Sequence, residues 1–244
     1  MRVNATDIKN NLGEYLRRCE KEDVIITRHG KDIAVLKAID DTPVVCEKAV
    51  AYDIPRDNEP IAKMTYEEYR KFMEGKDEHD QYELIDGFLY HISSPNIYHQ
   101  HALSRLHVLF SNWLEGKKCD VYFSPFDIVL NIHRENPDVV QPDLMVICDL
   151  DEHLDEDGYY RGVPSLVLEI LSSSSKRKDM LLKLNLYMQS GVKEYWVVNP
   201  INKEITVYMF ENKDIKDHKN CVMGMACKSF IFEGLEIKLE NVFK

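Results

Sequence analysis

The sequence lacks the patterns that mark membrane, zinc-binding and disulfide-rich proteins. It has no positively charged start followed by an apolar stretch, and no apolar run long enough to cross a bilayer. Its cysteines form no C-x-x-C pair and no zinc pattern with histidines, and their scatter argues against a disulfide framework. We therefore expect a cytoplasmic protein with reduced thiols and no membrane partner. The six cysteines are Cys19, Cys46, Cys119, Cys148, Cys221 and Cys227.

Glycine, proline and positive charge are also scarce. Only 10 glycines and 9 prolines in 244 residues argue against extensive disorder, and the length suits one large domain or a medium one with a small appendage. A formal net charge of -11 disfavours a protein coated in basic surface for non-specific nucleic-acid binding, although it leaves room for a local basic groove. Excess acid also serves solubility, which is the simpler explanation of the charge.

The first 40 residues predict a small α+β unit. A helix begins at a capping Asn4 or Thr6 and carries apolar residues at helical spacing. One helix and a few strands bury little surface alone, so we expect this unit to dimerise or to pack on the rest of the chain. The strands are predicted at residues 1–3, 23–28 and 32–39.

A resemblance to the Phd/YefM antitoxins rests on two stretches, M-R-V-N-A-T-D-I-K-N-N-L-G-E-Y-L and V-I-I-T-R-H-G-K-D-I-A-V-L. It implies a domain over residues 1–40 that forms homodimers and contacts operator DNA, and a toxin partner of unknown identity. No antitoxin-like tail follows. The basic residues of this unit suit phosphate contacts, and a solvated charged face explains them equally well. They are Arg2, Lys9, Arg17, Arg18, Arg28 and Lys31.

Residues 41–62 contain three prolines and little periodicity, which predicts a linker before a second domain at 63–244. The second domain alternates helices and strands, as an α/β fold does. It begins with a hairpin that turns at Asp86-Gly87. Helices are predicted after a cap at Thr65, over 97–114, and around Lys183 up to Gly191. Further strands are predicted at 121–130, 139–148, 165–171, 194–200, 204–210 and within the tail 221–242.

Two acids lie where a core would be apolar. Asp143 occurs in V-V-Q-P-D-L-M-V-I-C and Glu169 in P-S-L-V-L-E-I-L-S, and both runs predict buried strands. A buried carboxylate costs several kcal/mol unless it is paired or binds a cation. Two such acids on successive strands predict Mg²⁺ or Mn²⁺, which prefer oxygen ligands and assist phosphodiester hydrolysis. Lys183, in the following helix, can offset the negative charge of the reaction.

This part of the chain resembles the PD-(D/E)xK restriction-endonuclease-like superfamily, and in particular the Uma-type endonucleases. The motifs are Y-E-L-I-D-G, S-P-N-I-Y-H-Q, S-P-F-D-I-V-L, V-Q-P-D-L-M-V, L-V-L-E-I-L-S and K-L-N-L-Y-x-x-x-G-V-K-E-Y-W-V-V-N-P. The resemblance implies a mixed central sheet flanked by helices. It also implies metal ligands at Glu83, Asp143 and Glu169, with the carbonyl of Ile170 adding a fourth.

The superfamily pattern places lysine at the position of Leu171, so the signature is broken there and Lys183 is the family's match. His99 and Tyr187 are expected to support the site, and Asp127 to lie behind it. Three of the proposed site residues have a structural alternative. Glu83 could be an exposed hairpin residue, Asp143 could bond to the local backbone, and Lys183 could pair with Asp179. The basic run Lys176, Arg177 and Lys178 is either a nucleic-acid contact or a solvated helix cap.

Together these features predict a metal-dependent endonuclease, with catalytic Glu83, Asp143, Glu169 and Lys183, that acts on nucleic acid, in the first place DNA. The alternative is a DNA-binding regulator or antitoxin that keeps a nuclease-like domain as a non-catalytic platform. Leu171 and the acidic net charge favour the alternative.

Overall fold

A computed structural model of the chain describes residues 1–4, 23–28, 31–36, 60–76, 80–130, 136–156, 158–172 and 182–243. The chain divides into two compact units, Met1–Tyr52 and Asp53–Lys244. The predicted linker 41–62 lies largely outside the described residues, and the domain boundaries remain a prediction. None of the described helices combines the length and hydrophobicity needed to cross a bilayer.

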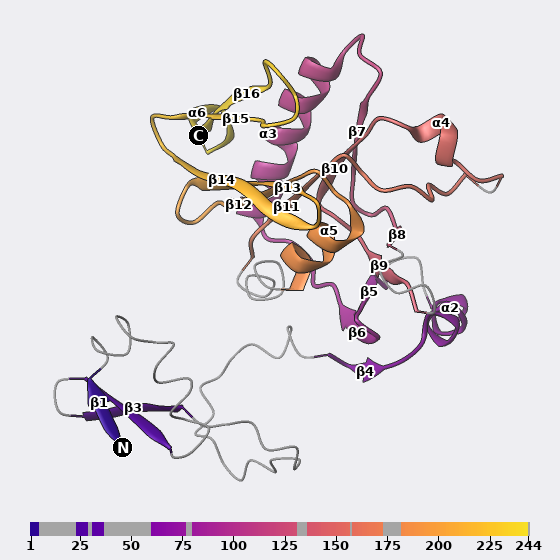
Figure 1. Ribbon diagram of the computed structural model, residues 1–244. Helices are drawn as coiled ribbons and strands as arrows, with labels where there is room; N and C mark the ends of the chain where they lie inside the picture. Colours follow the sequence, from indigo (N-terminus) through magenta and orange to yellow (C-terminus); the bar gives the residue numbers. More distant parts are fainter. Residues whose placement is uncertain are drawn as a thin grey trace. The chain divides into compact units, whose positions relative to one another are not determined.

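The first unit contains a three-stranded sheet in the order β1-β2-β3. Strand β1 (Arg2–Asn4) runs parallel to β2 (Val24–Arg28), which pairs antiparallel with β3 (Lys31–Leu36) (Figure 1). Val3 and Val24 are buried, which gives the sheet an apolar side. The predicted helix between β1 and β2 lies outside the described residues.

A mixed six-stranded sheet forms the centre of the second unit, as the sequence predicted. Only the β11–β12 pair is parallel, and the other neighbours are antiparallel. In spatial order the strands are β14 (Asp214–Val222), β13 (Glu204–Glu211), β12 (Glu194–Asn199), β11 (Leu166–Ile170), β10 (Leu144–Ile147) and β7 (Asp120–Phe123).

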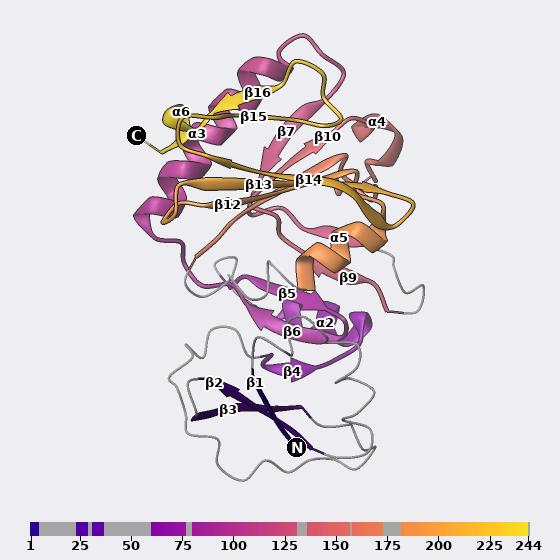
Figure 2. The same ribbon diagram turned by 60° about the vertical axis from the view of Figure 1, so that its left-hand side comes forward.

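One face of this sheet is covered by helix α3 (Ile97–Leu114) and the C-terminal elements, as Figure 2 shows. The helix begins at Asn96, whose side chain accepts a hydrogen bond from the backbone of His99. Its apolar stripe packs on the sheet, and Phe110 meets Trp196 edge to face with ring centroids 5.5 Å apart. The C-terminal elements are β15 (Ala226–Lys228), β16 (Glu236–Lys238) and α6 (Leu239–Val242).

The opposite face packs against helix α5 (Leu184–Ser190), and a second, five-stranded sheet lies beyond it (Figure 2). Met145, Val167 and Tyr195 of the six-stranded sheet share a core with Tyr187 of α5. The second sheet has the order β4 (Ala62–Lys63), β6 (Phe88–His91), β5 (Tyr82–Ile85), β9 (Asp138–Val140) and β8 (Ile128–Leu130). The described helices also include α2 (Tyr66–Glu74), capped by Thr65, and the short α4 (Leu150–His153).

Two predicted strands are each divided between the two sheets. The predicted strand 121–130 becomes β7 and β8, with Pro125 between them, and 139–148 becomes β9 and β10, with Pro142 between them. Proline cannot donate to a strand ladder, so the pairing ends there and the chain changes sheets. As a result, residues 141–143 lie at the junction of the sheets, where the candidate site is found.

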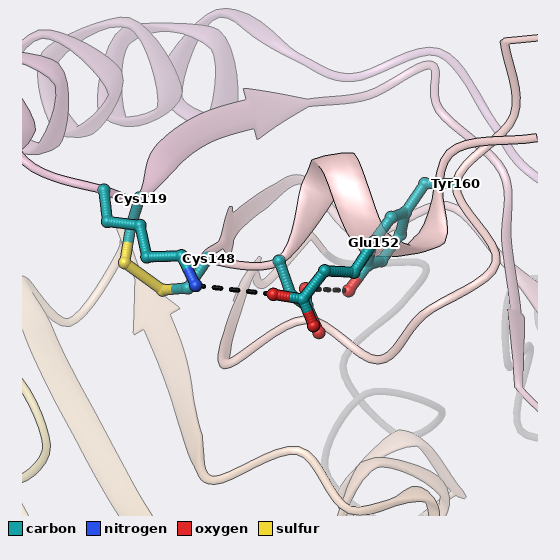
Figure 3. The surroundings of a disulfide bond; sticks show 6 residues. Cys119, Cys148, Glu152 and Tyr160 are labelled. Atoms are coloured by element: carbon teal, nitrogen blue, oxygen red, sulfur yellow. Dashed lines mark hydrogen bonds and ion pairs between the residues drawn. A yellow bond between two sulfur atoms is a disulfide. The ribbon is translucent and has the colours of Figure 1, made fainter.

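The expectation of reduced thiols is wrong for one pair of cysteines. Cys119 and Cys148 form a disulfide with their Cα atoms 4.0 Å apart (Figure 3). The pairing of Asp120 with Ile147 between β7 and β10 brings the two cysteines opposite each other, one step further along. The sequence could not reveal this because the contact depends on strand register. Lys118 and Glu152 form an ion pair of 3.5 Å beside the disulfide.

Candidate active site

Asp143 and Glu169 are cross-strand neighbours. Leu144 of β10 pairs with Leu168 of β11, so the antiparallel register places Asp143 opposite Glu169 at the next position. Directly opposed residues have Cβ atoms roughly 4.5–5.5 Å apart and project from the same face. Glu169 therefore projects from the face that α5 covers, together with Val167. Asp143 lies just beyond the paired residues, and its carboxylate also reaches His99 at the start of α3.

Donors from two elements hold the carboxylate of Asp143. The backbone N–H of Ile170 donates to Asp143 Oδ2 over 2.7 Å, and His99 Nε2 lies 3.0 Å from the same atom. The side chain of Asp143 keeps 17% exposure, whereas Glu169 keeps 4%. Asp143 is therefore the acid of this pair that opens toward solvent.

Lys183 bridges two buried acids. Its Nζ lies 2.8 Å from Glu83 Oε1 and 2.7 Å from Glu169 Oε1, and the Tyr187 hydroxyl donates to Glu169 Oε1 over 2.7 Å. The three charged side chains are no more than 4% exposed. Buried charges of this kind are stable only when paired with good geometry, which the bridge provides. Lys183 pairs with these acids across the site, and the alternative partner Asp179 lies outside the described residues.

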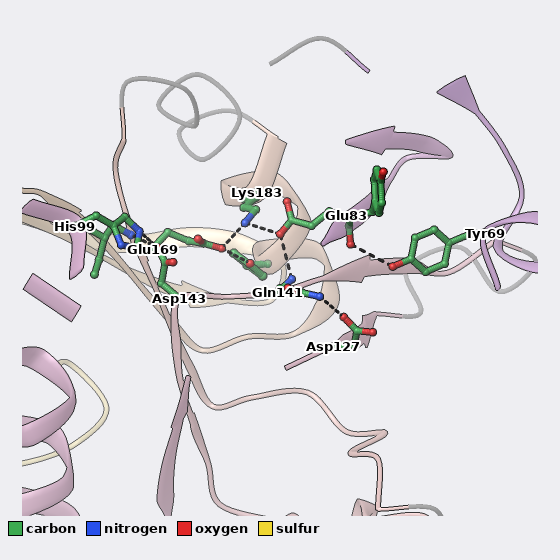
Figure 4. Close-up of polar contacts among 11 residues, drawn as sticks. Tyr69, Glu83, His99, Asp127, Gln141, Asp143, Glu169 and Lys183 are labelled. Atoms are coloured by element: carbon green, nitrogen blue, oxygen red, sulfur yellow. Dashed lines mark hydrogen bonds and ion pairs between the residues drawn. The ribbon is translucent and has the colours of Figure 1, made fainter. Parts of the chain in front are cut away.

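A further branch of the network runs from Glu83 to Asp127 through Gln141. The backbone N–H of Gln141 donates to Glu83 Oε1 over 3.1 Å, and its Nε2 donates to Asp127 Oδ1 over 2.7 Å. Burial raises the pKa of Asp127, the hydrogen bond from Gln141 opposes this rise, and the charge of Glu83 adds to it. Figure 4 shows the labelled residues extending from His99 and Asp143 at one end to Asp127 and Tyr69 at the other.

Tyr69 of helix α2 supports the strand that carries Glu83. Its hydroxyl donates to the carbonyl of Tyr82 over 3.1 Å, next to Glu83 in β5 (Figure 4). Burial and the nearby acids Asp127 and Glu83 raise the pKa of Tyr69, so the phenol stays protonated and remains a donor. This contact fixes β5 from the side away from Lys183.

The residues fit a two-carboxylate metal site better than the predicted three-acid site. Among the described residues, no three side chains of His, Cys, Asp or Glu converge to hold an ion. Glu83 is turned toward Lys183 instead. Asp143 and Glu169, opposite each other at the solvent-facing end of the network, remain a suitable pair, because Mg²⁺ usually takes one or two carboxylates and completes its shell with water and substrate.

The structure brings together all the predicted residues of the second domain that it describes. Glu83, Asp143, Glu169 and Lys183 form the network, while His99 and Tyr187 contact its acids. Ile170 contributes its backbone N–H to Asp143. Gln141 was not predicted as a site residue, although its position two residues before Asp143 on an extended segment was the available signal. The basic residues Lys9, Arg17, Arg18, Lys176, Arg177 and Lys178 lie outside the described residues, as do the side chains of Arg28 and Lys31.

Arg2 is the one predicted nucleic-acid contact whose side chain is described. It lies on the surface and forms a two-contact ion pair with Asp32, in which both N–O distances are 3.2 Å. An exposed pair of this kind contributes little to stability, so Arg2 can exchange its partner at small cost.

Comparison with protein-family models finds two matches. The model of Uma2, described as "Putative restriction endonuclease", matches residues 66–237. The model described as "Antitoxin Phd_YefM, type II toxin-antitoxin system" matches residues 1–85. The two matches overlap in 66–85, and the second extends past the residues on which the antitoxin resemblance was based. Both predicted family resemblances are confirmed.

Two individual proteins are also similar to this chain. The uncharacterized protein slr1290 of Synechocystis sp. is 29% identical over 150 residues, which are 61% of this chain and 75% of that protein. A crystal structure described as a "putative nuclease belonging to DUF820" from Anabaena variabilis superposes with a TM-score of 0.55 at 13% identity. It covers 71% of this chain and 96% of that chain. At this identity the likeness shows the fold alone. Together with the family match over residues 66–237, it confirms the predicted fold class of the second domain.

Proposed function

The chain belongs to the Uma2 family of "Putative restriction endonuclease" proteins, and on that basis we propose that it is an endonuclease dependent on Mg²⁺ or Mn²⁺ that hydrolyses phosphodiester bonds, DNA being its expected substrate. The observation that carries the proposal is the cross-strand pair Asp143 and Glu169 beside the buried ammonium of Lys183. Buried acids that face each other across a ladder repel, and a cation between them removes the cost.

Asp143 and Glu169 would hold the metal. When bound, Mg²⁺ supplies Lewis-acid stabilisation of the charge that builds up on a phosphoryl oxygen. His99 and the Ile170 N–H orient Asp143, and the Tyr187 hydroxyl orients Glu169, so each carboxylate is fixed before substrate arrives. The carbonyl of Ile170 stays in the proposal as a further ligand.

Lys183 would supply positive charge next to the scissile phosphate. Because two carboxylates flank its ammonium, the group stays charged and acts by electrostatic stabilisation. Glu83 is then best assigned as the acid that positions Lys183, and no longer as a metal ligand. Glu83 in turn is held by the Gln141 backbone.

The first unit is proposed to act in dimerisation and DNA contact. The support is the antitoxin family match over residues 1–85. Sedimentation of the full chain should give a dimer, and Arg2→Ala should weaken DNA binding and lower its salt dependence, because one phosphate contact is lost. The same match supports a toxin partner of unknown identity.

The nuclease proposal is tested with purified full-length protein on plasmid, single-stranded DNA and RNA, with Mg²⁺, Mn²⁺ or EDTA. We expect metal-dependent cleavage that falls by at least roughly a hundredfold in Asp143→Asn and Glu169→Gln. Calorimetry should show that both variants also lose Mn²⁺ affinity. The matched control is Glu152→Gln, a change at an exposed acid outside the network.

The alternative function is a DNA-binding regulator with a non-catalytic nuclease-like platform. It is favoured by Leu171, a buried apolar residue at the position where the superfamily has lysine. Cleavage by the wild type that persists unchanged in Glu169→Gln would point to a contaminant. DNA binding without cleavage and without carboxylate-dependent Mn²⁺ affinity would establish the alternative.

A further inference from the structure

A small pocket opens beside the candidate site, on the same face of the six-stranded sheet. Its volume is about 130 Å³, and its apolar part is formed by Leu171, Leu184 and Val197. The polar part includes Asn202, Glu204 and Tyr208. No role in the proposed chemistry has yet been given to any of these polar residues.

Strand register fixes the distance between this pocket and the acids. Glu169 pairs with Val197, and Val197 pairs with Thr206, so these three residues form one row on one face. Neighbouring strands are roughly 4.8 Å apart, and the pocket floor therefore begins one strand from Glu169. Leu171 and Leu184 follow Ile170 and Lys183 directly in the sequence. A nucleotide whose phosphate lies at the acids can thus reach the pocket with its own or the adjacent base.

The rim of the pocket presents an oriented carboxylate. Glu204 Oε1 accepts hydrogen bonds from the side-chain amides of Asn199 and Asn202 over 3.0 and 2.8 Å, and Oε2 accepts from Asn220 over 3.3 Å. An ionised carboxylate can accept roughly four hydrogen bonds and can donate none. The amides therefore fix its direction, and an acceptor held in this way is complementary to a ligand that carries an N–H donor.

The pocket is also lined by one aromatic ring. Tyr208 lines the pocket, and its ring lies in a row with the rings of Tyr195 and His218 on the neighbouring strands, in nearly parallel planes whose centroids are offset by 6.3 and 6.0 Å. These contacts fix the ring plane. Base stacking on aromatic side chains is a general mode of single-strand binding and does not depend on the identity of the base.

We propose that this pocket binds one unstacked base of a single-stranded nucleic acid beside the scissile phosphate, and that Glu204 makes it prefer cytosine. The size indicates a single ring, because a cavity of roughly 150 Å³ holds benzene. The carboxylate indicates an exocyclic amino group, as in the recognition of the cytosine amine by Glu or Asp. The inference extends the proposed nuclease function by naming its substrate class.

The network also has a purely structural interpretation. Asn199 Oδ1 accepts from the backbone N–H groups of Ile201 and Asn202, which closes the turn between β12 and β13. If that were the only role, changing Glu204 would alter stability without altering base preference.

Binding of fluorescent oligo(dC) and oligo(dU) to the full-length protein is measured in EDTA, so that metal-dependent cleavage does not interfere. Cytosine has an amino group at C4 and an acceptor at N3, whereas uracil has a carbonyl at C4 and an N–H at N3. The uracil N–H lies between two carbonyl oxygens, which repel a carboxylate. We expect a preference for oligo(dC) of roughly tenfold, equivalent to about 1.4 kcal/mol. Glu204→Gln, which can both accept and donate, should reduce the preference to less than about twofold.

The matched control is Glu211→Gln on the same strand, where Glu211 pairs with exposed Lys216 at 2.7 Å. This variant should keep the full preference. Tyr208→Leu should weaken binding of both oligonucleotides by a similar factor, because stacking is lost for either base. This second variant tests the pocket even if Glu204→Gln does not fold.

Equal binding of both oligonucleotides by the wild type, no binding of either, or a preference that survives in folded Glu204→Gln would overturn the inference. Separate cleavage assays with Mg²⁺ distinguish failure of the base-pocket inference from failure of the proposed nuclease function. A protein that cuts oligo(dC) and oligo(dU) equally, and binds them equally, keeps the nuclease function and loses the pocket. A protein that prefers oligo(dC) in binding and cuts neither keeps the pocket and loses the nuclease function.

Discussion

The ammonium of Lys183 lies 2.8 Å from Glu83 Oε1, which joins the segment leading into α5 to strand β5 of the second sheet. Glu169, on the six-stranded sheet, binds the same ammonium. One cation therefore connects both sheets at the candidate site. The position of β5 and the charge of the site depend on the same contact.

Replacing this cation should destabilise the fold. In Lys183→Met two buried carboxylates lose their partner, and we expect the free energy of unfolding to fall by about 3–5 kcal/mol. Adding Glu83→Gln removes one uncompensated charge and should restore part of the loss. Urea unfolding of the single and double variants measures both effects.

The control for that experiment is Lys216→Met, which removes an ion pair whose side chains are about half exposed. Exposed pairs contribute about 0–1 kcal/mol, so this variant should remain close to the wild type. If Lys183→Met were as mild as Lys216→Met, the buried bridge would not exist in solution.

Asp127 gives the site a pH-dependent stability. Burial raises its pKa, so the folded state disfavours its ionised form. The contribution of Asp127 to the free energy of unfolding is fully present below the ordinary aspartate pKa of roughly 3.9. It is lost as the pH rises through the raised pKa of the folded state. Asp127→Asn keeps an acceptor for Gln141 and carries no charge. The variant should therefore be more stable than the wild type near neutral pH, and the difference should shrink as the pH falls toward about 4.

Unfolding curves at several pH values test this sign directly. A variant that is less stable than the wild type at every pH would mean that ionised Asp127 stabilises the fold through its contacts. Cleavage activity, measured in parallel, reports whether the Asp127–Gln141 contact also matters for the position of Glu83.

The sequence predicted those parts of the site whose burial is visible in a single segment. A carboxylate such as Glu169 within L-V-L-E-I-L costs free energy in any buried strand unless it is paired, and the same holds for Asp143. Gln141 and the Cys119–Cys148 pair were missed because their contacts depend on the register between distant strands. Glu83 was predicted to bind metal, but its partner Lys183 could be assigned only once the two sheets were placed together. The breaks at Pro125 and Pro142 were visible in the sequence, and their consequence, a change of sheet, was not.

The disulfide should contribute measurably to stability. Cys119 and Cys148 close a loop with a sequence separation of 29, for which loop-closure entropy gives about 3.6 kcal/mol. Dithiothreitol should therefore lower the melting temperature of the wild type. A Cys119→Ser/Cys148→Ser double variant should melt near the reduced protein and should not respond to the reductant. Equal melting temperatures of wild type with and without reductant would show that the bond is absent in solution.

Glu194 should be essential for attaching the C-terminal segment to the sheet. It is fully buried, and its Oε2 accepts from the backbone N–H groups of Phe230 and Ile231 over 2.6 and 3.0 Å, while Oε1 accepts from the Trp196 indole. Hydrogen bonds to a charged acceptor contribute about 1.5–3 kcal/mol each. Glu194→Gln replaces one acceptor oxygen by a donor, so at least one of these bonds is lost and the free energy of unfolding should fall by about 2–3 kcal/mol. Glu194 shares the α3 face with Trp196, opposite the acids, so Mn²⁺ affinity measured by calorimetry should be unchanged in the folded variant. A loss of metal affinity without a loss of stability would contradict this assignment.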